Sequence, residues 1–145
     1  MPVDVITEIV IARPVQAVAE YAGNPEHAPA WYVNIKSVEW KTPPPLRVGS
    51  QVAFVAHFLG RRLAYTYEIV QHLPGQRLVM RTADGPFPME TTYTWTATSD
   101  GGTRMRLRNR GMPAGFSRWV APFMASAMRR ANRKDLQRLK AVLER

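Results

Sequence analysis

The sequence predicts an α+β fold in which one long C-terminal helix packs against an antiparallel β-sheet. Two observations support this prediction. Residues 116–144 form the only long segment with a helical apolar period, and the chain before Gly111 is divided by turn residues into runs of strand length. A single long helix that follows a series of short strands must bury its apolar stripe on their sheet, so any interior site depends on this helix.

Length and composition limit the class of protein. A chain of 145 residues with 46% hydrophobic residues is long enough for one domain with a real core. Asp4 and Glu8 lie in the first strand-like run, without the basic-then-apolar order of a signal peptide, and no segment approaches the roughly 20 apolar residues of a membrane span. The lack of cysteine excludes disulfides and thiolate metal sites. We therefore expect a cytoplasmic protein.

The N-terminal part of the chain predicts a strand, two short helices and a second strand. Residues 3–12 are apolar and β-rich, and Pro14 follows at a position where proline opens a helix. Asn24 and Pro25 fit the N-cap and first turn of another short helix. Residues 34–40 then predict the second strand.

Turn residues divide the middle of the chain into the strands of an antiparallel meander. The four turns contain Gly60, Gly75, Gly85 and Gly101. Alternation along the strands assigns charged residues to one face and apolar residues to the other. The inner face is unusually rich in aromatic residues and methionine, and it comprises Val52, Phe54, Ala56, Phe58, Tyr65, Tyr67, Ile69, Leu78, Met80, Met89, Thr91, Tyr93, Trp95, Met105 and Leu107.

Four segments of the chain have a familiar order. They are IVIARPVQAVAEYAGNPEHAPAW (residues 9–31), PLRVGSQVAF (45–54), DGGTRMRLR (100–108) and LQRLKAVLE (136–144). With the elements around them, they resemble the START/Bet v 1-like (SRPBCC, helix-grip) superfamily, in particular its bacterial polyketide cyclase/dehydrase and lipid-transport branch. The resemblance spans essentially the whole chain and implies a single ligand-binding domain over residues 1–145.

This resemblance implies a curved seven-stranded antiparallel sheet wrapped around the last helix, with two short helices between the first two strands. Members of the superfamily bind lipids, sterols, flavonoid-like molecules or polyketides in a cavity between sheet and helix, and some catalyse cyclisation or dehydration. The branch has no universal catalytic motif, so no catalytic residue is carried over to this sequence. We expect no cofactor and no metal, because the three histidines are dispersed and no carboxylate cluster accompanies them.

The inner face favours a ligand-sized cavity over a solid core. Several large rings and methionines share this face, one helix must cover a wide sheet, and buried tyrosine and tryptophan need polar partners. Methionine also suits a pocket that adapts to irregular apolar ligands. The residues expected to bind the ligand are Trp31, Phe54, Phe58, Tyr65, Tyr67, Met80, Thr91, Tyr93, Trp95, Met105, Phe123, Met124, Ala127, Met128 and Asp135.

The last helix carries two polar residues within its apolar stripe. At 3.6 residues per turn, Asn132 and Asp135 fall among the leucines and methionines that should face the sheet. A buried carboxylate is costly unless paired, so Asp135 either lies at an open cavity end or meets an arginine or a tyrosine hydroxyl. The alternative places both residues at the wetted edge of the stripe. They are the best polar candidates for orienting a ligand.

The first half of the predicted helix is apolar over most of its circumference. Phe116, Trp119 and Phe123 belong to a second apolar set that one sheet cannot cover on a straight helix. Pro122 therefore kinks the helix, or this half forms a lid, or the rings form an exposed patch. Such a patch would suit a homodimer interface or contact with an anionic membrane.

Four arginines alternate along one strand, at positions 104, 106, 108 and 110. They lack the aromatic stacking partners of a nucleic-acid surface, so no nucleic-acid binding is expected. The net charge of +9 is likewise scattered rather than gathered in a basic tail. We interpret this arginine ladder as a solvated face that pairs with Glu90 and with Glu8 or Glu68 on neighbouring strands.

Three functional hypotheses follow from the sequence. The first is a carrier or sensor that binds a small hydrophobic or amphipathic molecule, lipid-like or polyketide-like. The second is a polyketide aromatase, cyclase or dehydratase that uses the same cavity, and the third is an adaptor for an anionic partner or membrane surface. Whether the protein is an enzyme stays open. The groups available for acid/base chemistry are Tyr65, Tyr67, Tyr93, Asn109, Asp135 and His27.

Overall fold

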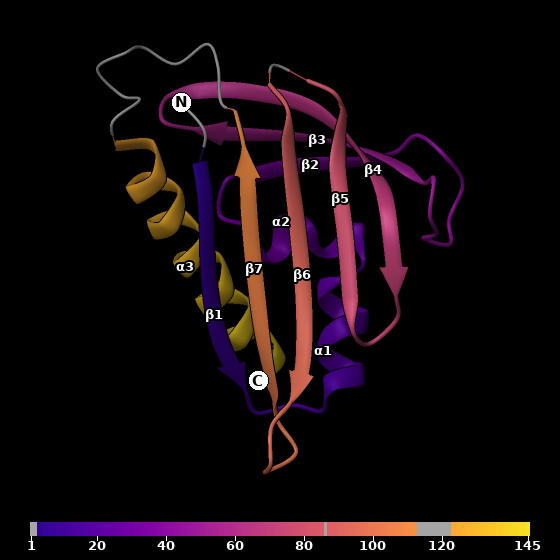
Figure 1. Ribbon diagram of the computed structural model, residues 1–145, viewed down its shortest axis with the longest axis vertical. Coiled ribbons are helices and arrows are strands. Elements are labelled where there is room, and N and C mark those ends of the chain that lie inside the picture. The colour runs from indigo at the N-terminus through magenta and orange to yellow at the C-terminus, as the bar shows by residue number, and fades with distance from the viewer. Residues whose placement is uncertain (1–2, 86, 113–122) are drawn as a thin grey trace.

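The computed structural model describes residues 3–85, 87–112 and 123–145 and has the expected α+β helix-grip fold (Figure 1). Seven strands form one curled antiparallel sheet in the order β1-β7-β6-β5-β4-β3-β2. From β2 to β7, each strand pairs with the strands that precede and follow it in the sequence, as in a meander. β1 instead pairs with β7. The strands are β1 (Val3–Ile11), β2 (Ile35–Trp40), β3 (Gln51–Phe58), β4 (Arg61–Leu73), β5 (Arg77–Asp84), β6 (Met89–Ala97) and β7 (Thr103–Gly111).

Short helices connect β1 to β2, as predicted. They are α1 (Val15–Ala22), the 3-10 helix η1 (Pro25–His27) and α2 (Ala28–Trp31). Pro14 is the N-cap of α1, and the Asn24 side chain caps η1 by accepting a hydrogen bond of 3.0 Å from the Glu26 N–H. The buried side chains of α1 and α2 share one core with α3, so all these helices cover the same face of the sheet.

The C-terminal helix α3 spans Met124–Leu143, and its buried face is the predicted stripe. Leu136, Leu139 and Leu143 lie in the core, and Asn132 and Asp135 are buried beside them. The predicted kink, lid or patch concerns residues 116–127, of which 116–122 lie outside the described residues. Phe123, which precedes α3, is 67% exposed. Across the described residues, no helix has both the length and the apolar character that a membrane crossing needs.

The end of α3 is attached to the outer edge of β1, beside which the helix runs (Figure 1). Lys140 Nζ donates a hydrogen bond of 2.9 Å to the Val10 carbonyl, and the Ala12 N–H donates one of 2.8 Å to Glu144 Oε2. Arg13 Nη1 also donates to the Leu143 carbonyl, at 2.8 Å. These contacts fix the C-terminal end of the helix across the first strand.

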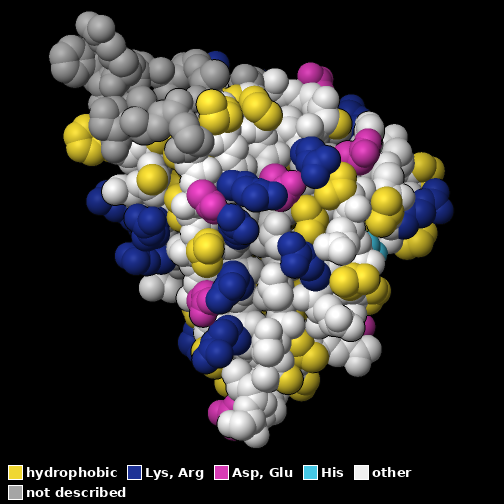
Figure 2. Space-filling model, viewed as in Figure 1, with side chains coloured by type: hydrophobic (Ala, Val, Ile, Leu, Met, Phe, Trp, Pro, Cys, Tyr) yellow, Lys and Arg dark blue, Asp and Glu magenta, His cyan; other side chains and the backbone are white. Residues whose placement is uncertain are grey.

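The outer face of the sheet carries the arginine ladder, paired with acidic side chains on neighbouring strands. Arg106 contacts Glu8 at 2.6 Å, and Arg110 contacts Glu90 at 2.7 Å. Arg108 forms two hydrogen bonds with Asp4, a partner that the sequence analysis did not name. Glu68 accepts a hydrogen bond from Gln51. Figure 2 shows basic and acidic side chains interspersed on this face, as the interpretation of a solvated, paired surface requires.

Candidate ligand-binding cavity

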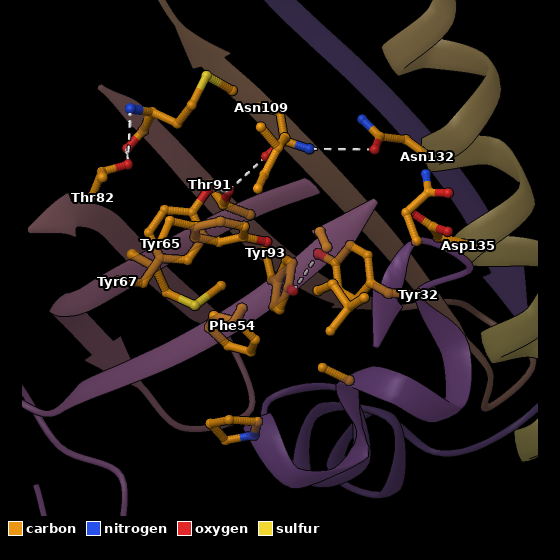
Figure 3. Close-up of a pocket in the computed structure, with 18 of the residues that line it drawn as sticks. Tyr32, Phe54, Tyr65, Tyr67, Thr82, Thr91, Tyr93, Asn109, Asn132 and Asp135 are labelled. Atoms are coloured by element: carbon orange, nitrogen blue, oxygen red, sulfur yellow. Dashed lines mark hydrogen bonds between the residues drawn. The ribbon is translucent and has the colours of Figure 1, made fainter. Parts of the chain in front are cut away.

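A cavity of about 160 Å³ lies between the inner face of the sheet and the first half of α3. Strands β3 to β7, the segment from α1 to β2 and α3 all contribute to its walls (Figure 3). Along the strands, one end of the inner face lines the cavity and the other end is packed into the core. On β6, for example, Met89, Thr91 and Tyr93 line the cavity, whereas Trp95 lies further along, in the core that α1 and α3 share.

Most of the residues expected to bind a ligand line this cavity. Side chains that line it are thereby available for contact with a ligand, and their role in binding stays a prediction. The expected residues found in the lining are Phe54, Phe58, Tyr65, Tyr67, Met80, Thr91, Tyr93, Met124, Met128 and Asp135.

The structure places the other five expected residues away from the cavity. Trp95 and Met105 occupy the packed end of the inner face, where they are 5% and 0% exposed. Trp31 is also in the core, where its ring packs against the rings of Tyr32 and Tyr93. These two tyrosines line the cavity and Trp31 does not. Phe123 points to solvent, and Ala127 is half-buried on α3 outside the lining. His27 is likewise outside the lining and stacks on Tyr21.

Several lining residues were not among those expected. Tyr32 and Asn34 come from the connection between α2 and β2, whose path no local pattern specifies, and Ile35 is the first residue of β2. Thr82 continues the alternation of Leu78 and Met80 along β5, so one further step of that pattern would have found it. The remaining lining residues are Ala22, Gly23, Asn24, Pro25, Ala28, Ala56, Leu63, Ile69, Leu78, Phe87, Met89, Asn109, Ala131 and Asn132.

Aromatic rings form one wall of the cavity. Tyr65 and Tyr67 meet edge to face with centroids 5.1 Å apart, and Phe54 lies 5.7 Å from Tyr65. Next to these rings, the hydroxyl groups of Tyr32 and Tyr93 hydrogen-bond to each other (Figure 3). Such a wall offers flat apolar surface with a few polar atoms at its edges.

A chain of polar side chains crosses the cavity from β4 to α3. The Tyr67 hydroxyl lies 2.9 Å from Thr91 Oγ1, which donates to Asn109 Oδ1 at 2.5 Å. Asn109 Nδ2 then donates to Asn132 Oδ1 at 3.3 Å (Figure 3). The chain ends at Asn132 Nδ2, a buried donor without a hydrogen-bond partner among the described residues.

Asp135 lies one turn beyond Asn132 on α3 and is 3% exposed. Its Oδ1 accepts a hydrogen bond of 2.8 Å from the Val33 N–H, rather than from an arginine or a tyrosine hydroxyl. Burial raises the pKa of this carboxyl group to about 7, although the Val33 N–H and the charge of Arg138 oppose the increase. The pKa of the Asp135 carboxyl group therefore lies close to neutral pH.

The tyrosines of the cavity are neutral at physiological pH. Burial raises the pKa of Tyr67 to about 12, against the opposing effect of its hydrogen bond with Thr91. Burial also raises the pKa values of Tyr32, Tyr65 and Tyr93 well above the ordinary value for a phenol. These side chains can donate and accept hydrogen bonds, and they are not bases at neutral pH.

The chain matches the family described as "Polyketide cyclase / dehydrase and lipid transport" over residues 2–144. It therefore belongs to this family. A comparison with curated proteins gives no match.

Solved structures of low sequence identity share the fold. The Zhui aromatase/cyclase from Streptomyces sp. R1128 has a TM-score of 0.82 at 13% identity, with 100% of this chain and 95% of that chain covered. A START superfamily protein from Mycobacterium smegmatis has a TM-score of 0.82 at 11% identity, with 97% of both chains covered. The major latex-like protein 151 from Panax ginseng has a TM-score of 0.75 at 14% identity, with 97% of this chain and 96% of that chain covered. At these identities the likeness concerns the fold alone.

Proposed function

We propose that this protein binds a small hydrophobic or amphipathic molecule, lipid-like or polyketide-like, in the cavity between its sheet and α3. The observation that carries the proposal is the cavity itself, because apolar and aromatic side chains form most of its wall and a few polar groups converge in it. An apolar cavity of about 150 Å³ in another protein is known to bind benzene, so a volume of about 160 Å³ suits a compact ring or chain.

The first test is the identification of a co-purified molecule. Native mass spectrometry of the purified protein should show a bound species of low mass, and organic extraction should release it for identification. A second measurement covers a ligand lost during purification, namely the uptake of an apolar dye that fluoresces in a dry environment. If the protein carries no bound species and also takes up no dye, the proposal is contradicted.

A pair of variants tests whether binding occurs in this cavity. Ala131 lines the cavity from α3, whereas Ala141 lies on the exposed face of the same helix. Ala131→Trp should fill the cavity and abolish ligand or dye binding, and Ala141→Trp should leave binding unchanged. Circular dichroism checks that both variants are folded. Equal binding by Ala131→Trp would place the ligand elsewhere.

One observation favours a second candidate function, the dehydration or cyclisation of a polyketide-like substrate. Asp135 is a buried carboxyl group with a pKa of about 7, and general acid/base catalysis is most efficient when the pKa of the group lies near the working pH. Because the side chain also lines the cavity, it would be close to the carbonyl and hydroxyl groups of such a substrate.

Turnover measurements separate the carrier from the enzyme. A suitable probe is a β-hydroxyketone such as the aldol of benzaldehyde and acetone, whose loss of water gives an absorbing conjugated enone. For an enzyme, Asp135→Asn should abolish the dehydration of the probe while probe binding is retained, and Tyr65→Phe and Tyr67→Phe report on the neighbouring hydroxyls. No acceleration by the wild-type protein, with the probe bound, would favour the carrier.

A further inference from the structure

One buried polar atom at the cavity has no hydrogen-bond partner in the described part of the chain. Asn132 is 5% exposed, and its Nδ2 has no hydrogen-bond partner among the described residues. A buried N–H group without an acceptor costs about 1–3 kcal/mol, so such groups are rare unless something else satisfies them. Because Asn132 lines the cavity, a ligand is the natural source of the missing acceptor.

The hydrogen bonds leading to Asn132 determine which of its atoms is left free. The Thr91 hydroxyl has one proton, and it gives that proton to Asn109 Oδ1, which can only accept. The Tyr67 hydroxyl must then donate to Thr91 rather than accept from it. Asn109 presents its Nδ2 to Asn132 Oδ1. The amide of Asn132 is thereby oriented with its oxygen occupied and its N–H groups free.

The charges around the cavity restrict the ligand further. The described residues of the lining include no arginine, lysine or histidine, and Asp135 supplies their only carboxyl group. A carboxylate ligand would be buried there without a counter-ion and one helical turn from a second carboxyl group. The positive charges of the protein lie outside, for example in the arginine ladder on the opposite face of the sheet.

We infer that the ligand carries an uncharged oxygen acceptor, such as a ketone or ester carbonyl, that accepts the free N–H of Asn132, and that the cavity excludes carboxylates. The inference rests on the proposed binding function and adds to it the polarity and the charge of the ligand. It also assigns the orientation of the ligand, with its carbonyl group towards α3 and its apolar body against the aromatic wall of β3 and β4.

A set of compounds with nearly the same shape tests the inference. Isopropylbenzene, acetophenone, benzoate and α-phenylethylamine differ mainly in the polarity and charge of one side group. Their Kd values are measured at neutral pH by titration calorimetry, where benzoate is an anion and the amine is a cation. Isopropylbenzene reports on the proposed function, because it fits an apolar cavity and makes no hydrogen bond.

Replacement of Asn132 gives the decisive comparison. In Asn132→Leu, the affinity for acetophenone relative to isopropylbenzene should fall about tenfold or more, because the N–H is lost and the volume is kept. Gln137→Leu, on the exposed side of α3, should leave this ratio unchanged. The ratio is measured on folded protein that still binds isopropylbenzene, so a misfolded variant cannot imitate the result. Asn132→Ala serves if the leucine variant does not fold.

The charge requirement has its own test. Benzoate should bind the wild-type protein about a hundredfold or more weakly than acetophenone, and Asp135→Asn should improve benzoate binding about tenfold by removing the repulsion. An unchanged ratio in both Asn132 variants would overturn the inference, as would tighter binding of benzoate or of the amine than of acetophenone. If isopropylbenzene does not bind at all, the proposed function itself fails.

Discussion

Asp135 on α3 and Val33 after α2 are joined by a hydrogen bond of 2.8 Å between the carboxyl group and the backbone N–H, across 102 positions of the sequence. The bond attaches the last helix to the segment that also carries Tyr32, whose hydroxyl is bonded to Tyr93 on β6. Asp135, whose carboxyl group joins the two segments, also lines the cavity.

We predict that the stability of the protein changes between about pH 4 and pH 7 because of Asp135. Its pKa is about 7 in the folded protein and about 3.8 when unperturbed, so the folded state binds the proton more tightly. This contribution to stability is complete below pH 4 and is lost as the pH rises through 7. The tyrosines around Asp135 do not titrate in this range, because burial raises the pKa values of Tyr32, Tyr65 and Tyr93.

Asp135→Asn isolates this effect, because asparagine keeps an acceptor for the Val33 N–H and has no proton to lose. The free energy of unfolding from urea titrations should rise for the variant relative to the wild type by a few kcal/mol from pH 4 to pH 7.5. Asp4→Asn is the matched control, because the hydrogen bond from Arg108 lowers the pKa of Asp4 and any pH dependence from this group lies below about pH 4. Its difference from the wild type should therefore stay nearly constant from pH 4 to pH 7.5. A constant difference between Asp135→Asn and wild type across this range would contradict the prediction.

Thr91→Val should destabilise the protein by about 1–3 kcal/mol, because it removes a partner from both Tyr67 and Asn109 without changing the volume. Thr96→Val, at an exposed position of the same strand, should change the free energy of unfolding by less than about 0.5 kcal/mol. Tyr67→Phe combined with Thr91→Val should cost less than the sum of the single changes. Additive costs would show that the two hydroxyls are not coupled.

Glu90→Gln should cost about 1 kcal/mol near neutral pH, because Glu90 pairs with arginines on both neighbouring strands, Arg81 at 3.1 Å and Arg110 at 2.7 Å. Burial alone would raise the pKa of Glu90, but the hydrogen bonds from Arg110 and Arg81 outweigh it and lower the pKa. The cost should therefore disappear as the pH falls and Glu90 is protonated. Glu39→Gln, which removes the exposed pair with Lys41, should have little effect at any pH.

Gly111→Ala should destabilise the protein by about 1–3 kcal/mol, because an added methyl group would overlap the Pro88 carbonyl oxygen and Met89 Sδ at the end of β7. The control is Gly75→Asn, at a turn with open space around it and a φ of 76° that asparagine tolerates. Thermal melting followed by circular dichroism compares the two. If both variants melt like the wild type, β7 must be able to move away from β6 at this point.

The sequence predicted which face of the sheet is buried better than it predicted where along that face the cavity lies. Alternation placed Tyr93, Trp95 and Met105 on the inner face, and all three are buried. Only Tyr93 reaches the cavity, because α3 and α1 close the other end of the face with packed side chains. The period of a strand specifies the side on which a residue lies and carries no information about its position relative to a helix distant in sequence.

The polar groups of the site show a similar limit. The helical period placed Asn132 and Asp135 in the buried stripe, and the structure decides between the two alternatives by burying both. The partner of Asp135 could not be found from side-chain types, because a backbone N–H provides the hydrogen bond. Asn34 and Tyr32 line the cavity from a connection whose path depends on tertiary contacts rather than on local pattern.

The attachment of α3 to β1 also bears on self-association. β1 is an edge strand, and the unpaired backbone groups of an edge are a template on which another chain can add a strand. In this protein the Val10 carbonyl is occupied by Lys140 and the Ala12 N–H by Glu144, so backbone groups at this end of the edge are already satisfied from within the chain. The helix that closes the cavity thus also shields one border of the sheet from intermolecular β-pairing and aggregation.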